Sequence, residues 1–409
     1  MKILVTTFSF PDSSIRSYDG RFVLSEVRAY ARNGAEVLVL TPHYPGAQRD
    51  ERLEPGIRVR RFRYFLPTRW QRLKVPGKPI YRPGSLLAFM QIPLLLAAFV
   101  LAILRHARAV DIIHAQWTLT GLLALPAKWF FGTPVIITAR GSDIRLLPIA
   151  VNRFLHRHVD ASIDCFRPLP WSAWYKKTYP TRFLSLPLIV DSGSSTAPRT
   201  ELLAFAGSHP QLFVLLYAGR FDLEKMQRNR LPLLDLIFAT SILKVRGWTP
   251  RVFFLGQGTV GIEAAMRQAI AENALHDDVT LLGPHLDIAP YARACHLGLG
   301  GIGLNGVAQD FILARTPQLL MCTPENQDTP WRDGRNALMI APGDPLLLAN
   351  RIQWAMTHRV KIQEIGEQAF ADFAEYLADT DRGGRLYLSA FQELLDEVKI
   401  THTDAGSEL

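Results

Sequence analysis

Cysteine is scarce in this chain, with three residues among 409. Cys165, Cys295 and Cys322 lie far apart, are odd in number and have apolar neighbours. This pattern excludes a disulfide framework and a cysteine metal site. We therefore expect free thiols in the core of a protein from a reducing compartment.

Several other features are absent. With 48% hydrophobic and 20% charged residues the chain is too apolar for disorder, and no fixed repeat or low-complexity tract is present. The N-terminus, MKILVTTFSF, lacks a small-residue cleavage site and predicts a strand rather than a signal peptide. At this length, two domains of roughly 200 residues each are expected.

Acidic residues are few in the first half. Residues 1–190 carry 27 Lys/Arg and 11 Asp/Glu, a net charge of +16, whereas 191–409 carry a net charge of −7 within the total of +9. A basic surface of this size predicts an anionic partner. Nucleic acid, a phosphorylated small molecule and an acidic membrane leaflet all fit.

The hydrophobic pattern predicts an α/β fold. A strand at Ile3–Thr7, a periodic helix at Phe22–Arg32 and a strand at Val37–Leu40 form a βαβ opening. The same order restarts with a strand at Phe213–Ala218, after the Ser/Thr/Pro-rich stretch Ser192–Thr200. We expect two doubly wound parallel-sheet units joined near residues 190–200.

A basic segment precedes the longest apolar run. Arg58–Arg82 holds nine basic residues, several aromatic ones and no acidic one, and Ser85–Leu104 is almost entirely apolar. The run has the length of a membrane span, but the strands before and after it are predicted in one sheet, which favours a buried or an interfacial helix. A solvated loop and an RNA-binding loop are alternatives for the basic segment, although no RNA-binding motif is present. We expect an anionic membrane surface to be bound through residues 58–104, and no nucleic acid.

Two loops in the second half have the composition of phosphate sites. Gly256 begins a G-x-G-x-x-G motif between a strand and a helix, but no acidic residue ends the next strand, so a tight turn competes with a dinucleotide site. Arg220 and Lys225 follow the strand at Phe213–Ala218 and are spaced to clamp a diphosphate. The alternative is an ion pair of these cations with nearby acids.

Polar residues also follow strands of the first half. His114 comes after one apolar strand, and Arg140 and Asp143 come after the next. Gly20 ends a loop whose backbone N–H groups are suited to an anion. Polar side chains at the same edge of a sheet predict a cleft, whereas a single histidine there more often only makes structural hydrogen bonds.

Eight segments together resemble the family 4 glycosyltransferases over nearly the whole chain. In order they are the Gly20 loop, DIIHAQW, PVIITARGSDI, LPLIVD, YAGRFDLEK, FLGQGTVGIE, VTLLGP and GRNALMIAPGDP. The resemblance implies the GT-B architecture, which has two facing Rossmann-like domains and an interdomain cleft. It also implies a retaining, metal-independent transfer from a nucleotide-diphosphate sugar, UDP- or GDP-linked, without a cofactor.

The same resemblance assigns residues to roles. Catalytic positions fall on His114, Arg140 and Asp143, where Arg140 replaces the usual histidine. The donor-binding residues that it implies are Gly20, Arg220, Lys225, Gly256, Asn305 and Asp310. The family has two glutamates in an E-x7-E motif, but here Ile302 stands at the first position and Asp310 at the second. Either the donor sugar differs, or Asn305 substitutes, or catalysis has been lost.

The leading hypothesis is a hexosyltransferase-type enzyme of polysaccharide or glycoconjugate biosynthesis. It would act on a glycan or lipid-linked acceptor, peripherally at the inner face of the cell membrane. The alternative is a catalytically impaired GT-B protein that binds a glycan or serves as a scaffold. The expected domains are 1–190 on the acceptor side, 201–380 on the donor side, a helix over 381–400 that packs back on the first domain, and a disordered tail over 401–409.

Overall fold

The computed structural model describes residues 1–12, 20–74, 85–140, 143–165, 167–190, 212–219, 221, 233–285, 288–300, 304, 306–322 and 329–407. The chain divides into two compact units. Unit 1 comprises Met1–Asp191 and Tyr376–Leu409, and unit 2 comprises Ser192–Glu375. The sequence places the end of the second domain at residue 380, five residues later than the structure does.

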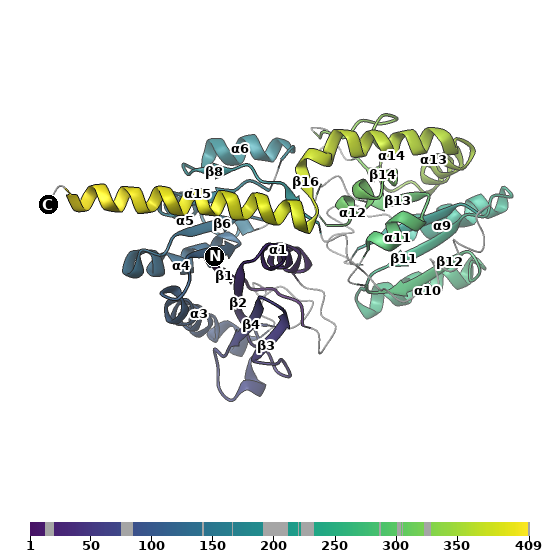
Figure 1. The fold of residues 1–409 in the computed structure, drawn as a ribbon. Helices are drawn as coiled ribbons and strands as arrows, with labels where there is room; N and C mark the ends of the chain where they lie inside the picture. Colours follow the sequence, from purple (N-terminus) through teal and green to yellow (C-terminus); the bar gives the residue numbers. More distant parts are fainter. Residues whose placement is uncertain are drawn as a thin grey trace. The chain divides into compact units, whose positions relative to one another are not determined.

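Unit 1 contains an eight-stranded sheet (Figure 1). Its order is β3-β4-β2-β1-β5-β6-β7-β8, and only the β3–β4 pair is antiparallel. The strands are β1 (Lys2–Thr6), β2 (Glu36–Pro42), β3 (Asp50–Glu54), β4 (Ile57–Phe62), β5 (Ile112–Gln116), β6 (Val135–Thr138), β7 (Ala161–Ile163) and β8 (Phe183–Leu184). Strand order reverses between β1 and β5, which makes their carboxyl ends the expected ligand edge.

Helices cover both faces of this sheet. Ile3 and Val5 of β1 point to one face and Leu4 points to the other, as alternation along a strand requires. The first face packs against α1 (Arg21–Arg32) and α15 (Thr380–Ser407). The second face packs against α3 (Ile92–Ala107), α4 (Thr118–Phe131) and α5 (Ile149–His158). Shorter helices are α2 (Leu86–Met90), α6 (Pro170–Thr178) and the 3-10 turns η2 (Thr68–Trp70) and η3 (Asp143–Arg145).

The C-terminal helix α15 belongs to unit 1. Tyr387 and Phe391 of α15 are buried against Tyr30 of α1, with ring centroids 5.7 and 5.8 Å apart. Gly384 allows this close approach, because a Cβ there would lie 2.3 Å from the Ala29 carbonyl oxygen. A two-stranded sheet of β9 (Leu188–Ile189) and β16 (Leu377–Ala378) joins the same unit.

The end of α15 differs from the sequence-based expectation. The polar residues from Thr401 predict a disordered tail, whereas the structure continues the helix to Ser407. Propagating an established helix fixes one residue for each hydrogen bond gained, and no proline interrupts this stretch. Polar composition alone was therefore a poor guide to where the helix ends.

The apolar run forms α2 and α3, and each of these helices has both buried and exposed apolar side chains. Phe99 and Ile103 of α3 are buried against the sheet and Leu95 is buried against Tyr64 and Leu73, whereas Leu94 and Leu101 are exposed. Leu86–Ala107 is long and apolar enough to cross a membrane, and 28% of its most apolar window is buried. The buried stripe packs α3 on the sheet of unit 1. A buried helix was thus the correct prediction for one face of α3 only.

Three cations of the basic segment Arg58–Arg82 are paired with acids of β3. Arg58 and Arg60 contact Asp50 of β3 at 2.6 and 3.0 Å, and Arg61 contacts Glu51 at 2.9 Å. The hydrogen bond from Arg58 holds the pKa of Asp50 well below its usual range. The segment contains no acid of its own, but β3 hydrogen-bonds to β4 and brings two acids to it.

Unit 2 contains a six-stranded parallel sheet in the order β12-β11-β10-β13-β14-β15. The strands are β10 (Val214–Ala218), β11 (Arg251–Leu255), β12 (Val279–Gly283), β13 (Leu297–Gly300), β14 (Gln318–Met321) and β15 (Leu338–Ile340). The order reverses between β10 and β13, so their carboxyl ends form the expected ligand edge of this unit.

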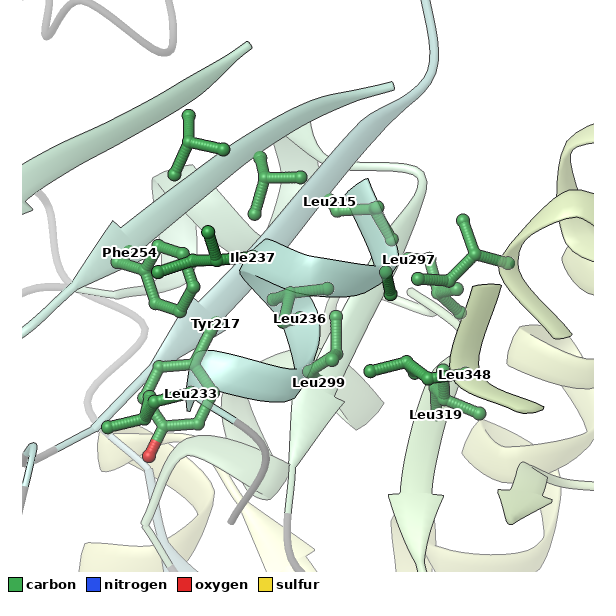
Figure 2. Packing of buried hydrophobic residues seen from close by; sticks show 14 of the residues in the cluster. Leu215, Tyr217, Leu233, Leu236, Ile237, Phe254, Leu297, Leu299, Leu319 and Leu348 are labelled. Atoms are coloured by element: carbon green, nitrogen blue, oxygen red, sulfur yellow. The ribbon is translucent and has the colours of Figure 1, made fainter. Parts of the chain in front are cut away.

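Helices lie on both faces of the second sheet as well. One face packs against α9 (Leu233–Val245), α10 (Val260–Glu272) and α13 (Pro345–Thr357), and the other packs against α11 (Ala289–Ala294) and α12 (Val307–Leu313). Figure 2 shows Leu215, Phe254 and Leu236 in the larger of these cores. Helix α14 (Arg359–Phe373) also belongs to unit 2, and the 3-10 turn η5 (Ala374–Tyr376) spans the boundary along the chain to unit 1. The predicted pair of doubly wound α/β units is confirmed.

Candidate functional site

The predicted residues of unit 1 gather at the carboxyl edge of its sheet, beside the reversal in strand order. His114 lies in β5, Arg140 and Asp143 follow β6, and Gly20 directly precedes α1. Gly20 has a φ of 76°, and a Cβ there would lie 2.2 Å from the Ser9 carbonyl oxygen. Glycine therefore lets the start of α1 approach the end of β1.

Arg140 is held in a closed ring of hydrogen bonds. Its Nη2 donates to Glu26 Oε1 at 2.5 Å and to Gln116 Oε1 at 2.6 Å, and Gln116 Nε2 donates to Glu26 Oε2 at 2.6 Å. The side chains of Arg140 and Glu26 are only 13% and 3% exposed. Burial acts to lower the pKa of Arg140, but the Glu26 carboxylate outweighs it and raises this pKa above its ordinary value. The site thus contains a fixed, permanently charged guanidinium.

Sequence reasoning missed Glu26 and Gln116. A usable signal was present for Glu26, because it lies three residues after Val23 and four before Tyr30, on the helix face predicted to be apolar. A carboxylate on such a face needs a buried cation or several donors. Gln116 gave no comparable signal beyond its position at the end of an apolar strand.

His114 is completely buried inside β5 rather than placed after it. Its Nε2 lies 2.7 Å from Thr138 Oγ1 and its Nδ1 lies 3.2 Å from the Tyr30 hydroxyl. Burial lowers the pKa of His114 to about 4, so the imidazole is neutral at pH 7. The strand register turns its side chain toward α1 and α15, where it supports the Tyr30 cluster. This geometry favours the structural alternative for His114 over direct contact with a substrate.

Asp143 organises the loop that carries Arg140. Its carboxylate accepts hydrogen bonds from the backbone N–H groups of Thr118, at 2.8 Å, and Arg140, at 2.9 Å. Burial raises the pKa of Asp143, and these N–H groups oppose the shift. Because Thr118 begins α4, the carboxylate ties that helix to the loop after β6. Asp143 positions Arg140 through this link.

Trp117 and Phe22 form an aromatic corner beside Arg140. Trp117 has φ 73° and ψ 151°, a conformation that is strained for any residue except glycine. Its ring contacts Phe22 at 5.7 Å between centroids, and the Arg140 guanidinium lies 4.5 Å from the Phe22 ring centre. Strain of this kind clusters at functional sites, so this corner adds to the site predicted from sequence.

The glycine motif of unit 2 is explained by contact between two loops. A Cβ on Gly256 would lie 1.8 Å from the Gly219 carbonyl oxygen, and one on Gly258 would lie 2.7 Å from Phe221. The Gly258 N–H donates to the Glu263 carboxylate in the first turn of α10, at 2.8 Å. A carboxylate at this helix start disfavours a dinucleotide phosphate there, and the tight-turn prediction is confirmed. The backbone of Gly256 packs against Gly219, the residue that directly precedes Arg220.

The other donor-side predictions have different outcomes. Asp310 lies in the first turn of α12 and is 2% exposed, close in sequence to the end of β13. Arg220, Lys225, Asn305 and Ile302 lie outside the described residues. Their predicted roles remain predictions.

The described residues contain no group of three or more His, Cys, Asp or Glu side chains arranged to hold a metal ion. The three cysteines are free. Burial raises the pKa of Cys165 to about 12 and also raises that of Cys295, so both thiols stay protonated at neutral pH. A free core thiol is confirmed for Cys295, whereas Cys165 is free but only partly buried.

Comparison with known proteins gives the family context. The family described as "Glycosyl transferase 4-like domain" matches residues 20–166. No curated protein sequence matches the chain. Among solved structures, sucrose-phosphate synthase from Thermosynechococcus elongatus is similar, with a TM-score of 0.67 and 18% identity over 97% of this chain and 100% of that one.

Two further solved structures have the same fold. Anabaena HepE in complex with UDP and glucose gives a TM-score of 0.64 and 17% identity over 96% of this chain and 100% of that one. The trehalose-6-phosphate synthase OtsA gives a TM-score of 0.65 and 12% identity over 96% of this chain and 99% of that one. Residues 20–166 are thus similar to a glycosyl transferase 4-like domain, and the chain has the GT-B fold of two Rossmann-like units.

Proposed function

We propose that the protein is a retaining glycosyltransferase that moves a sugar from a nucleotide-diphosphate donor to a glycan or lipid-linked acceptor. The observation that carries this proposal is the match of residues 20–166 to the glycosyl transferase 4-like domain. The charged, strained site at the carboxyl edge of the same domain supports it, because this is the edge where ligands bind in open α/β sheets.

The donor is assigned to unit 2. Anabaena HepE, which shares the fold, has solved complexes with UDP and with UDP-glucose. The end of β10, where strand order reverses, leads through Gly219 directly to Arg220. In the proposed reaction Arg220 and Lys225 neutralise the charge that develops on the departing diphosphate, and Asp310 accepts hydrogen bonds from ribose hydroxyls. The acceptor hydroxyl oxygen bonds to the anomeric carbon on the face that the diphosphate leaves, the bond from that carbon to the diphosphate oxygen breaks, and the hydroxyl proton passes to that oxygen, without a protein nucleophile or a metal.

Donor binding is tested by calorimetry with UDP-glucose and with a GDP-linked hexose. We expect the wild type to bind one of them, and Arg220→Ala to abolish that binding. The matched control is Arg267→Ala, which removes an exposed arginine of unit 2 on α10. Absence of nucleotide-sugar binding at millimolar concentration would refute the enzyme proposal.

In this proposal unit 1 binds the acceptor, and it does so at a membrane surface. Residues 58–104 combine basic and aromatic side chains with the partly exposed helices α2 and α3. Such a segment suits anionic headgroups, which supports peripheral attachment at the inner face of the cell membrane and a role in polysaccharide or glycoconjugate biosynthesis.

A second candidate rests on Ile302, which cannot hydrogen-bond a donor sugar. Each hydrogen bond to a charged carboxylate contributes about 1.5–3 kcal/mol, so its loss is large enough to impair catalysis. The protein would then bind a glycan or act as a scaffold. Nucleotide-sugar binding with neither transfer nor donor hydrolysis would favour this candidate, whereas turnover would exclude it.

A further inference from the structure

The helices on one face of unit 1 expose an unusual amount of large apolar surface. The outermost side chains of α4 and α5 include Trp129, Phe130 and Phe154, which are 56%, 72% and 42% exposed. On α2 and α3 the exposed apolar side chains include Leu86, Phe89, Met90, Leu94 and Leu101. We name these eight side chains the outer helix face. Single exposed apolar residues are common, but a contiguous set marks an interaction surface.

The outer helix face lies on helices that pack against one another in sequence, α2 on α3, α3 on α4 and α4 on α5. Helix α4 packs between α3 and α5 on the same side of the sheet (Figure 1). Trp129 of α4 contacts Phe154 of α5 with ring centroids 6.4 Å apart, and Arg108 after α3 lies 4.5 Å from the Phe131 ring centre. Trp129 and Phe154 therefore form one apolar surface across α4 and α5.

Charge on these helices has a single sign. Helices α2, α3, α4 and α5 contain no Asp or Glu, while Arg105, Arg153 and Arg157 are exposed on them. The loops between these helices contain Asp111 and Asp143, and both are engaged by backbone N–H groups. A partner for this face thus needs apolar character and negative charge together.

We propose that the outer helix face docks on an anionic lipid bilayer, with α3, α4 and α5 lying in the headgroup region. The inference rests on the proposed membrane attachment and extends it from residues 58–104 to α4 and α5. Amphipathic helices with cations beside aromatic and leucine side chains bind interfaces in this way. Docking by these helices brings unit 1, which carries the candidate site, to the bilayer surface. A lipid-linked acceptor is the class that this placement favours.

Vesicle sedimentation tests the proposal with the full chain. The probes are vesicles of phosphatidylcholine alone and of phosphatidylcholine mixed equally with phosphatidylglycerol. We expect the wild type to bind the anionic vesicles. The double variant Trp129→Ser with Phe130→Ser should lose at least about tenfold in vesicle affinity. Arg153→Gln and Arg157→Gln should each lower that affinity about fivefold, because each removes one charge. The matched control is Phe238→Ser with Val360→Ser, exposed apolar residues of unit 2, which should bind as the wild type does.

The outcomes separate this inference from the proposed function. Unchanged vesicle binding by the Trp129/Phe130 variant, folded by circular dichroism, would overturn the role of α4 and α5 even if residues 58–104 still bind lipid. A dimer in sedimentation velocity that the same variant abolishes would also overturn it, because a second copy would then cover this face. Donor calorimetry does not depend on vesicles, so failure of the donor proposal appears there alone.

Discussion

Removing the charge of Glu26 tests the buried ring at the candidate site. Glu26→Gln keeps the shape of the side chain but leaves the Arg140 guanidinium, 13% exposed, without its counter-charge. Breaking a buried ion pair by changing one partner costs about 3–5 kcal/mol, since the remaining charge stays out of water. For a unit of this size each kcal/mol lowers the unfolding temperature by about 2–4 °C. We therefore expect a loss of about 6–20 °C.

Thermal unfolding followed by circular dichroism measures this effect. Glu36→Gln is the matched control, because Glu36 and Lys2 form a pair 4.0 Å apart with both side chains mostly exposed, and such pairs contribute about 0–1 kcal/mol. The double variant Glu26→Leu with Arg140→Met replaces the pair by apolar groups and should be more stable than Glu26→Leu alone. If Glu26→Gln unfolds at the temperature of the control, the reasoning about a buried, coupled charge is refuted.

Three further predictions concern single groups. Because burial lowers the pKa of His114 to about 4, its NMR signals should show a neutral ring down to about pH 5. The stability that the neutral ring contributes above pH 6.5 should be lost as the pH falls toward 4. Titration of the His114 ring near pH 6.5 would contradict this. Gly256→Ala should lower the unfolding temperature, since its Cβ would collide with the Gly219 carbonyl, whereas Gly261→Ala, with open space around it, should not. Cys165, whose pKa burial raises to about 12, should react with a thiol reagent only after denaturation; rapid labelling of the native protein would disagree.

Local patterns in the sequence were sufficient for the α/β class and for much of the domain division. Continuous apolar strands such as β5 and β6 require cover on both faces, and only helices packed on a parallel sheet provide it. The glycine motif at Gly256 was also readable as a turn, because no acidic residue ends the following strand. The end of α15 could not be predicted from the sequence, since the same polar residues are compatible with a helix or with a disordered tail.

The scarcity of acidic residues in the first half of the chain predicts a cationic surface, and the net charge behind this prediction follows from the sequence alone. Tertiary structure decided which cations remain on that surface: β3 pairs with Arg58, Arg60 and Arg61, and Glu26 reaches Arg140 across 114 positions. It also decided that α3 has one buried and one exposed side. Composition and periodicity record what a segment contains, whereas pairing and burial depend on neighbours that only the folded chain brings together.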